Sequence, residues 1–177
     1  MKEFEEAINW LEEVCLVYKV DRCSKVGYPL KFYEEPNIFK LFPSDLGLLG
    51  CMANIDLASI FAKGTFFAEF NGAFAEQLIA QTLIANGFAP FYYAKPNSRL
   101  KLDFLIQCGN SVFPIDATSG SKPKSKSLKT ILGENPSLTA LRFSQIGLKR
   151  QDNIVSIPLF MADSWLRRLK KSKSASP

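Results

Sequence analysis

The chain has 177 residues, of which 47% are hydrophobic and 22% are charged, and its formal net charge is +5. This composition is ordinary for a globular soluble protein, and the length suits one domain or a compact domain with a small N-terminal unit. The absence of histidine excludes histidine-based catalysis, and the wide spacing of the four cysteines argues against a structural zinc site.

No part of the sequence is typical of a targeting or membrane segment. The N-terminal residues MKEFEEAINW are acidic and amphipathic, unlike a signal peptide. The longest apolar stretch, around Leu46 to Ile55, is too short and too interrupted to span a bilayer. A P-loop sequence is also absent, so no ATP site of that kind is expected in this chain. We therefore expect a cytoplasmic protein with reduced thiols and no membrane contact.

Residues 1–63 are predicted to form an N-terminal appendage, with Lys63-Gly64 as the best candidate for a hinge. Glu3–Val14 has the apolar spacing of an amphipathic helix, and Cys15–Val20 follows as a short strand. A basic and aromatic segment comes next. These elements are therefore interpreted either as the end of a truncated winged-helix unit or as a plain helical lid on the main core.

The segment that follows is broken by prolines and is predicted to be largely irregular. Gly27–Pro43 is expected to be a loop that contains one short apolar piece, Ile38–Phe42. Ser44-Asp45 is expected to cap a short helix through Leu49, and a second short helix is expected over Ile55–Phe61. Their apolar density predicts that both helices pack on the core.

Residues 64–177 are predicted to form the α/β core with a basic C-terminal tail. Apolar residues recur every four positions from Phe66 and predict a long helix, which Gly87 ends. The predicted apolar stripe of this helix comprises Phe66, Phe70, Phe74, Leu78, Ile79, Leu83 and Ile84. The residues expected in the core are Leu83, Ile84, Phe91, Leu102, Phe104, Ile106, Phe113, Ile115, Leu141 and Phe143.

Two stretches of alternating apolar residues on either side of Gly109-Asn110 predict a β-hairpin with a two-residue turn. The remaining predicted elements are a helix from about Ser125, strands over Ser137–Phe143 and Ile154–Ile157, and a C-terminal helix after Pro158. The helices from Phe66 and Ser125 are expected to cover the sheet.

Three carboxylates are predicted to gather on this core. Glu76 lies on the long helix, Asp103 on the first hairpin strand and Asp116 on the second. A two-residue turn places Asp103 opposite Asp116, and Lys101 opposite Thr118. Two facing carboxylates repel each other, unless a divalent cation such as Mg²⁺ or Mn²⁺ or a basic side chain lies between them. The alternative is two solvated aspartates, with Glu76 in a salt bridge.

A helix with a glutamate, a strand with an aspartate and an acidic residue on the paired strand resemble the constellation of PD-(D/E)XK nucleases. More narrowly, the chain resembles the C-terminal module of bacterial and archaeal AAA-type ATPases called domain of unknown function 4143. The resemblance runs from about Glu3 to Leu166. It is carried, in order, by AINWLEEVCLVYKV, YPLKFYEEPNIFKLFPSDLGLL, FNGAFAEQLIAQTL, FYYAKPNSRLKLDFLI, FPIDATSG and IPLFMADSWL.

This resemblance implies an α/β fold with a mixed sheet in the order helix, three strands, helix, strand. It also implies that Asp103 and Asp116 would hold Mg²⁺ or Mn²⁺, and that Glu76 would bind the metal or orient water. The chain departs from the family pattern at Thr118, where the resemblance expects a lysine that positions water and offsets charge. Lys101 and Lys122 are candidate replacements, but we favour loss of the lysine's role.

A basic run follows the hairpin, in a segment rich in serine and glycine. Its lysines are interpreted either as phosphate contacts beside the carboxylates or as a solvated charge run. The lysines of this run are Lys122, Lys124, Lys126 and Lys129.

Two classes of function are therefore expected. The first is a catalytically degenerate nuclease-fold module that binds nucleic acid, such as DNA, or a protein partner, such as an AAA-type ATPase. The second is a Mg²⁺-dependent phosphodiester-hydrolysing nuclease with a relocated lysine. A remnant without retained activity is a third possibility.

Overall fold

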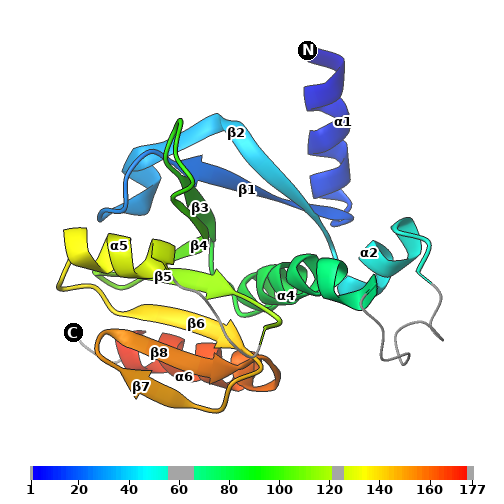
Figure 1. Ribbon diagram of the computed structural model, residues 1–177. Coiled ribbons are helices and arrows are strands. Elements are labelled where there is room, and N and C mark those ends of the chain that lie inside the picture. Colours follow the sequence, from blue (N-terminus) through cyan, green and yellow to red (C-terminus); the bar gives the residue numbers. More distant parts are fainter. Residues whose placement is uncertain (1, 56–65, 121–125, 175–177) are drawn as a thin grey trace.

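The computed structural model describes residues 2–55, 66–120 and 126–174 and shows a mixed α/β fold (Figure 1). Eight strands form one sheet in the order β2-β1-β3-β4-β5-β6-β8-β7. The helices are α1 Lys2–Glu13, α2 Leu46–Met52, α4 Phe66–Ala85, α5 Lys126–Glu134 and α6 Ala162–Ser174. The strands are β1 Val17–Cys23, β2 Glu34–Pro43, β3 Phe91–Ala94, β4 Lys101–Cys108, β5 Ser111–Ala117, β6 Ala140–Ser144, β7 Lys149–Gln151 and β8 Ile154–Pro158. Two 3₁₀ turns are η1 Leu30–Tyr33 and η2 Leu159–Met161.

The predicted mixed α/β fold is confirmed. Helix α4 precedes the three strands β3, β4 and β5, and α5 then precedes β6. The pairs β3/β4 and β4/β5 are antiparallel, whereas β5/β6 and β6/β8 are parallel, so the sheet is mixed as expected. The parallel pairing of β5 with β6 requires a crossover, and α5 supplies it.

The sheet separates two hydrophobic clusters. Helices α4 and α6 pack with one face, and α5 with η1 packs with the other. Nine of the ten predicted core residues are buried, and the exception is Ile84, which is half-buried. The described part of α4 buries Ala75, Ile79 and Leu83, while Phe74 is half-buried. The buried side of α4 therefore includes Ile79 and Leu83 of the predicted stripe, whereas Phe74 and Ile84 lie at its margin. The sequence pattern did not define the buried side more closely, because this helix is apolar around most of its circumference.

The loop predicted over Gly27–Pro43 is wrong in its second half. Residues Glu34–Pro43 form the ten-residue strand β2, which is antiparallel to β1. Prolines are tolerated here because β2 is an edge strand and Pro43 is its last residue. Strand β1 also pairs with β3, so elements from the N-terminal segment continue the core sheet.

The N-terminal helix and the short helix cap are confirmed. Helix α1 stands beside the β1–β2 ribbon and leads directly into β1 (Figure 1). The Asp45 side chain caps α2 by accepting a 2.9 Å hydrogen bond from the Leu48 amide. Most of the second short helix, and the boundary at residues 63 and 64, lie outside the described residues. The two-part division and the winged-helix interpretation therefore stay predictions. None of the helices in the described ranges is both long and apolar enough to cross a membrane.

Helix α4 ends as predicted. Gly87 takes a φ of +69°, the left-handed conformation that glycine adopts at little cost. Lys170 of α6 donates hydrogen bonds to the carbonyls of Asn86 and Gly87, at 2.7 and 2.9 Å. A lysine at a helix C-terminus satisfies carbonyls that have no partner within the helix. This contact fixes α4 against α6.

Candidate carboxylate site

The predicted hairpin register is confirmed over five residue pairs. The pairs run from Phe104 with Ile115 to Cys108 with Ser111, around the Gly109-Asn110 turn. The ladder ends just before the pair formed by Asp103 and Asp116. The predicted pairing of Lys101 with Thr118 is not part of the ladder. Lys101 instead pairs with Ala94 of β3, and the Thr118 amide donates to the Phe143 carbonyl at 2.9 Å.

The neighbouring pairing of β3 with β4 has a register shift of the kind that a β-bulge makes. Between Leu102 and Leu105, three steps along β4 oppose two steps along β3. A bulge bends its strand and re-aims a side chain. Asp103 lies within this stretch, and its Oδ2 accepts a 2.8 Å hydrogen bond from the Ala117 amide of β5. The side chain of Asp103 thus replaces a backbone contact between the two strands.

A lysine that was not predicted lies at this site. Lys40 of β2 makes an ion pair with Glu76 of α4, with 2.6 Å between Nζ and Oε1. The Lys40 ammonium also lies 5.0 Å from the centre of the Tyr92 ring. The available signal was a lone lysine in the apolar run IFKLF. It was missed because that run was interpreted as a loop.

Two buried or half-buried amides hold β2 and α2 against α4. The Gln77 side chain donates to the Pro43 carbonyl at 2.7 Å, and the Gln81 side-chain oxygen accepts from the Leu46 amide at 2.8 Å. Both glutamines belong to α4 and lie one and five positions after Glu76. Their contacts place the end of β2 on α4, and this placement brings Lys40 within reach of Glu76.

The electrostatics of Asp103 show that the predicted carboxylates are close enough to interact. Burial, together with the negative charges of Glu76 and Asp116, raises the pKa of Asp103 to about 6. The Ala117 amide and the Lys40 ammonium oppose these effects. A carboxyl with this pKa is the kind of group that functional sites contain, although structural ion-pair networks produce such shifts too.

The described side chains do not gather into a metal site. No cluster of three acidic or cysteine side chains with the arrangement of a metal site occurs in residues 2–55, 66–120 or 126–174. Glu76, one of the three predicted ligands, is instead paired with Lys40. Binding of Mg²⁺ or Mn²⁺ by Asp103 and Asp116 therefore stays a prediction, and no chemical step is derived through a metal.

The other predicted site residues have different surroundings. The Thr118 hydroxyl accepts a 3.2 Å hydrogen bond from the Gly120 amide, so it closes a turn after β5. Lys101, Lys126 and Lys129 are exposed, the last two on α5. Lys122 and Lys124 lie outside the described residues.

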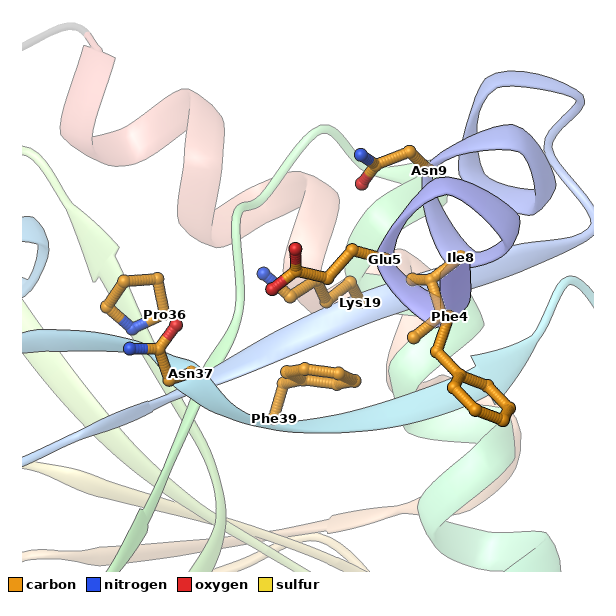
Figure 2. A pocket seen from close by; sticks show the side chains of 8 residues that line it. All are labelled: Phe4, Glu5, Ile8, Asn9, Lys19, Pro36, Asn37 and Phe39. Carbon is orange, nitrogen blue, oxygen red and sulfur yellow. The ribbon is translucent and has the colours of Figure 1, made fainter. Parts of the chain in front are cut away.

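A groove of about 730 Å³ lies elsewhere on the molecule, between α1 and the β1–β2 ribbon. Figure 2 shows that one set of lining side chains comes from α1 and the other from the two strands of the ribbon. None of the predicted site residues lines it. Its lining residues are Phe4, Glu5, Ile8, Asn9, Lys19, Pro36, Asn37 and Phe39.

The family described as Domain of unknown function (DUF4143) matches residues 71–160 of the chain. The chain belongs to the DUF4143 family. The DUF4143 match contains Glu76, Asp103, Asp116 and Thr118, whereas Lys40 and the α1 groove lie before it. No curated protein and no solved structure matched the chain.

Proposed function

We propose that this DUF4143 chain is a nuclease-like module that binds nucleic acid without cutting it. The order of α4, β3, β4, β5, α5 and β6 agrees with the order implied by the PD-(D/E)XK resemblance. The positions of Glu76, Asp103 and Asp116 on α4, β4 and β5 support the same comparison.

The ion pair between Lys40 and Glu76 is the main observation in favour of a module that does not cleave nucleic acid. It neutralises a carboxylate that a divalent cation would otherwise neutralise. The resemblance expects a lysine at position 118, but the threonine there carries no charge and its hydroxyl closes a turn. The site therefore retains its carboxylates, but Lys40 is ion-paired with one of them, Glu76.

The charge distribution supports nucleic acid as the ligand. Helix α1 holds five glutamates and one lysine, so the rest of the chain has 21 basic against 12 acidic residues. Exposed basic residues occur on α5, β7 and α6. Basic side chains release counterions from phosphates on binding, which gives affinity without sequence specificity.

Fluorescence anisotropy of a labelled DNA duplex, titrated in EDTA at several salt concentrations, tests the proposal. We expect a dissociation constant of about 10⁻⁵ M at moderate salt, with affinity that falls steeply as salt rises. Replacing both Lys126 and Lys129 with alanine should weaken binding and reduce the slope of log K against log salt. A matched double substitution of Lys25 and Lys31, which are also exposed, should leave the slope unchanged.

The proposal fails if the wild-type protein binds neither the duplex nor a single-stranded RNA at low salt. It also fails if both double variants lose the same affinity, because binding would then reflect only net charge. Denaturing gels of the same samples with Mn²⁺ in place of EDTA should show intact strands.

Metal-dependent hydrolysis is the second candidate, and Lys40 favours it. Its ammonium acts on the carboxyl of Asp103 as well as on Glu76, so it is a candidate for the relocated lysine. On this alternative, the gels with Mn²⁺ would show cleavage. The cleavage would be lost in both Asp116→Asn and Lys40→Met, and retained in Lys31→Ala.

Protein binding through α1 is the remaining alternative, and the exposure of its apolar side chains favours it. Phe4 is 76% exposed and Trp10 is 59% exposed on this acidic helix, beside the groove. Charge complementarity makes a basic amphipathic helix of a partner, such as an AAA-type ATPase, the fitting occupant. A labelled peptide with the sequence of residues 162–174 is a suitable probe. It should bind the wild type more tightly than Phe4→Ser if this alternative holds.

A further inference from the structure

Four polar residues form a row across the sheet, on strands β5, β6, β8 and β7. Asp116 pairs with Arg142 and Arg142 pairs with Ser156, both in parallel register. Ser156 also pairs with Lys149 in antiparallel register. Paired residues on neighbouring strands lie on the same face, with strands about 4.8 Å apart. The row therefore runs from Asp116, one of the three predicted carboxylates, to the far edge of the sheet.

The row lies on the sheet face that carries α5. Along β6 and β8, the preceding residues on that face are Ala140 and Ile154, which are buried in the cluster that contains Leu128 of α5. Arg142 and Ser156 come two residues later along their strands, where the face changes from apolar to polar. A cation and a hydroxyl thus follow directly after the hydrophobic cluster.

Arg142 is the unusual member of the row. Its Nε atom is buried and has no hydrogen-bond partner among the described residues. A buried donor without a partner is costly, and native proteins rarely keep one without a reason. Ser156 beside it is 8% exposed, and Lys149 at the end of the row is exposed. An anion bound along the row would contact the Arg142 guanidinium, the Ser156 hydroxyl and the Lys149 ammonium.

We propose that Arg142, Ser156 and Lys149 form a binding site for one phosphate group of the nucleic-acid backbone. This inference rests on the proposed function and names the contact through which it acts. A guanidinium binds phosphate with two parallel hydrogen bonds, and a hydroxyl adds a third donor. Arg142 is the register neighbour of Asp116, so that phosphate would lie on the α5 side of the sheet near one of the three predicted carboxylates.

The first test is the salt dependence of duplex binding by Arg142→Met, which keeps side-chain bulk and removes the charge. We expect affinity to fall about tenfold, because a charge-assisted contact is lost, and the log–log salt slope to fall by about 1. Arg142→Lys should keep the slope but still bind more weakly, since an ammonium lacks the fork of donors. The thermal stability of Arg142→Met should not fall.

Arg150→Met is the matched control. Arg150 is an exposed arginine on β7, but it pairs with Val155, whose side chain belongs to the core on the opposite face. Its loss removes the same charge from the same strand pair without touching the row. Equal losses of affinity in Arg142→Met and Arg150→Met would overturn the inference. A fall in stability with unchanged DNA binding would overturn it too, because Arg142 would then be structural.

Titration of isotope-labelled protein with inorganic phosphate, observed by NMR, separates this inference from the proposed function. We expect saturable shifts of the Arg142 Nε–H and Ser156 amide signals, and no such shifts in Arg142→Met. Phosphate binding without DNA binding would refute the proposed function and indicate a free phosphate-bearing ligand at the same site. The absence of phosphate shifts together with an unchanged salt slope would refute the inference alone.

Discussion

Asp103 takes part both in a hydrogen bond to the backbone and in the electrostatic interactions of the carboxylate site. Its carboxylate joins β4 to β5 through the Ala117 amide, while burial and two neighbouring carboxylates disfavour its ionisation. Because folding raises this pKa, Asp103 binds its proton more tightly in the folded protein than in the unfolded chain. Its contribution to stability is complete below about pH 4 and is lost as the pH rises through about 6.

The substitution Asp103→Asn should therefore change the pH dependence of folding. Asparagine keeps an oxygen for the Ala117 amide but cannot ionise. At pH 8 we expect the variant to be more stable than the wild type by about 2 to 3 kcal/mol, with the difference vanishing near pH 4. Urea unfolding at both pH values measures this.

Asp163→Asn provides a control of opposite sign. Hydrogen bonding from Asn86, together with Arg167, holds the pKa of the Asp163 carboxyl below its usual value. That carboxyl stabilises the fold above its unfolded pKa and loses the effect as the pH falls, so the variant should be less stable at pH 8 only. Similar pH profiles for Asp103→Asn and the wild type would contradict our account of Asp103.

We expect the four cysteines to differ in reactivity, because two are buried and two are exposed. Burial, aided by the nearby charges of Glu34, Glu35 and Asp21, raises the pKa of Cys23 to about 12. Cys108 is buried as well, whereas Cys15 and Cys51 are exposed. Because the thiolate is the reactive form, a thiol reagent at pH 8 should modify two cysteines in the native protein and all four in denaturant. Rapid modification of a third cysteine in the native state would argue against this fold.

At the scale of elements, the hairpin and α4 could be predicted because their signals are local. Alternation along β4 and β5 and a two-residue turn determine the register that brings Asp103 towards Asp116. Strand β2 could not be predicted in the same way, because its prolines suggested a loop and only its pairing with β1 makes it a strand. Lys40 was missed for this reason, since its approach to Glu76 depends on where β2 packs.

The end of α4 offers a test of element packing. Gly87→Ala should destabilise the protein by about 1 to 2 kcal/mol, because alanine at a φ of +69° is strained. An added Cβ would also lie 2.5 Å from Nζ of Lys170, which caps the helix. Thermal unfolding measures the loss.

Gly50→Ala is the matched substitution for that test. Gly50 lies within α2, and a Cβ added there would have no atom within 4 Å. Alanine favours the helix, so this variant should gain up to about 1 kcal/mol. Loss of stability in Gly50→Ala, or no loss in Gly87→Ala, would contradict the described helix ends.

At the scale of the whole molecule, one sheet links the carboxylate site to the other features. Strand β2 at one edge supplies Lys40, the central strands supply Asp103 and Asp116, and the row through Arg142 extends towards β7. Predicting Arg142 would have required the parallel register of β5, β6 and β8, which depends on the α5 crossover and on no local pattern. The sequence therefore predicted the acidic residues, but it predicted neither Lys40 nor Arg142 beside them.

The most direct measurement is calorimetric titration of the protein with Mn²⁺, alongside Asp103→Asn. If Lys40 neutralises Glu76 in place of a metal, the wild type should show no saturable heat at millimolar Mn²⁺ and should resemble the variant. Lys40→Met, which frees Glu76, is the variant in which binding should appear. Saturable Mn²⁺ binding by the wild type that disappears in Asp103→Asn would contradict the account and support a metal-dependent nuclease.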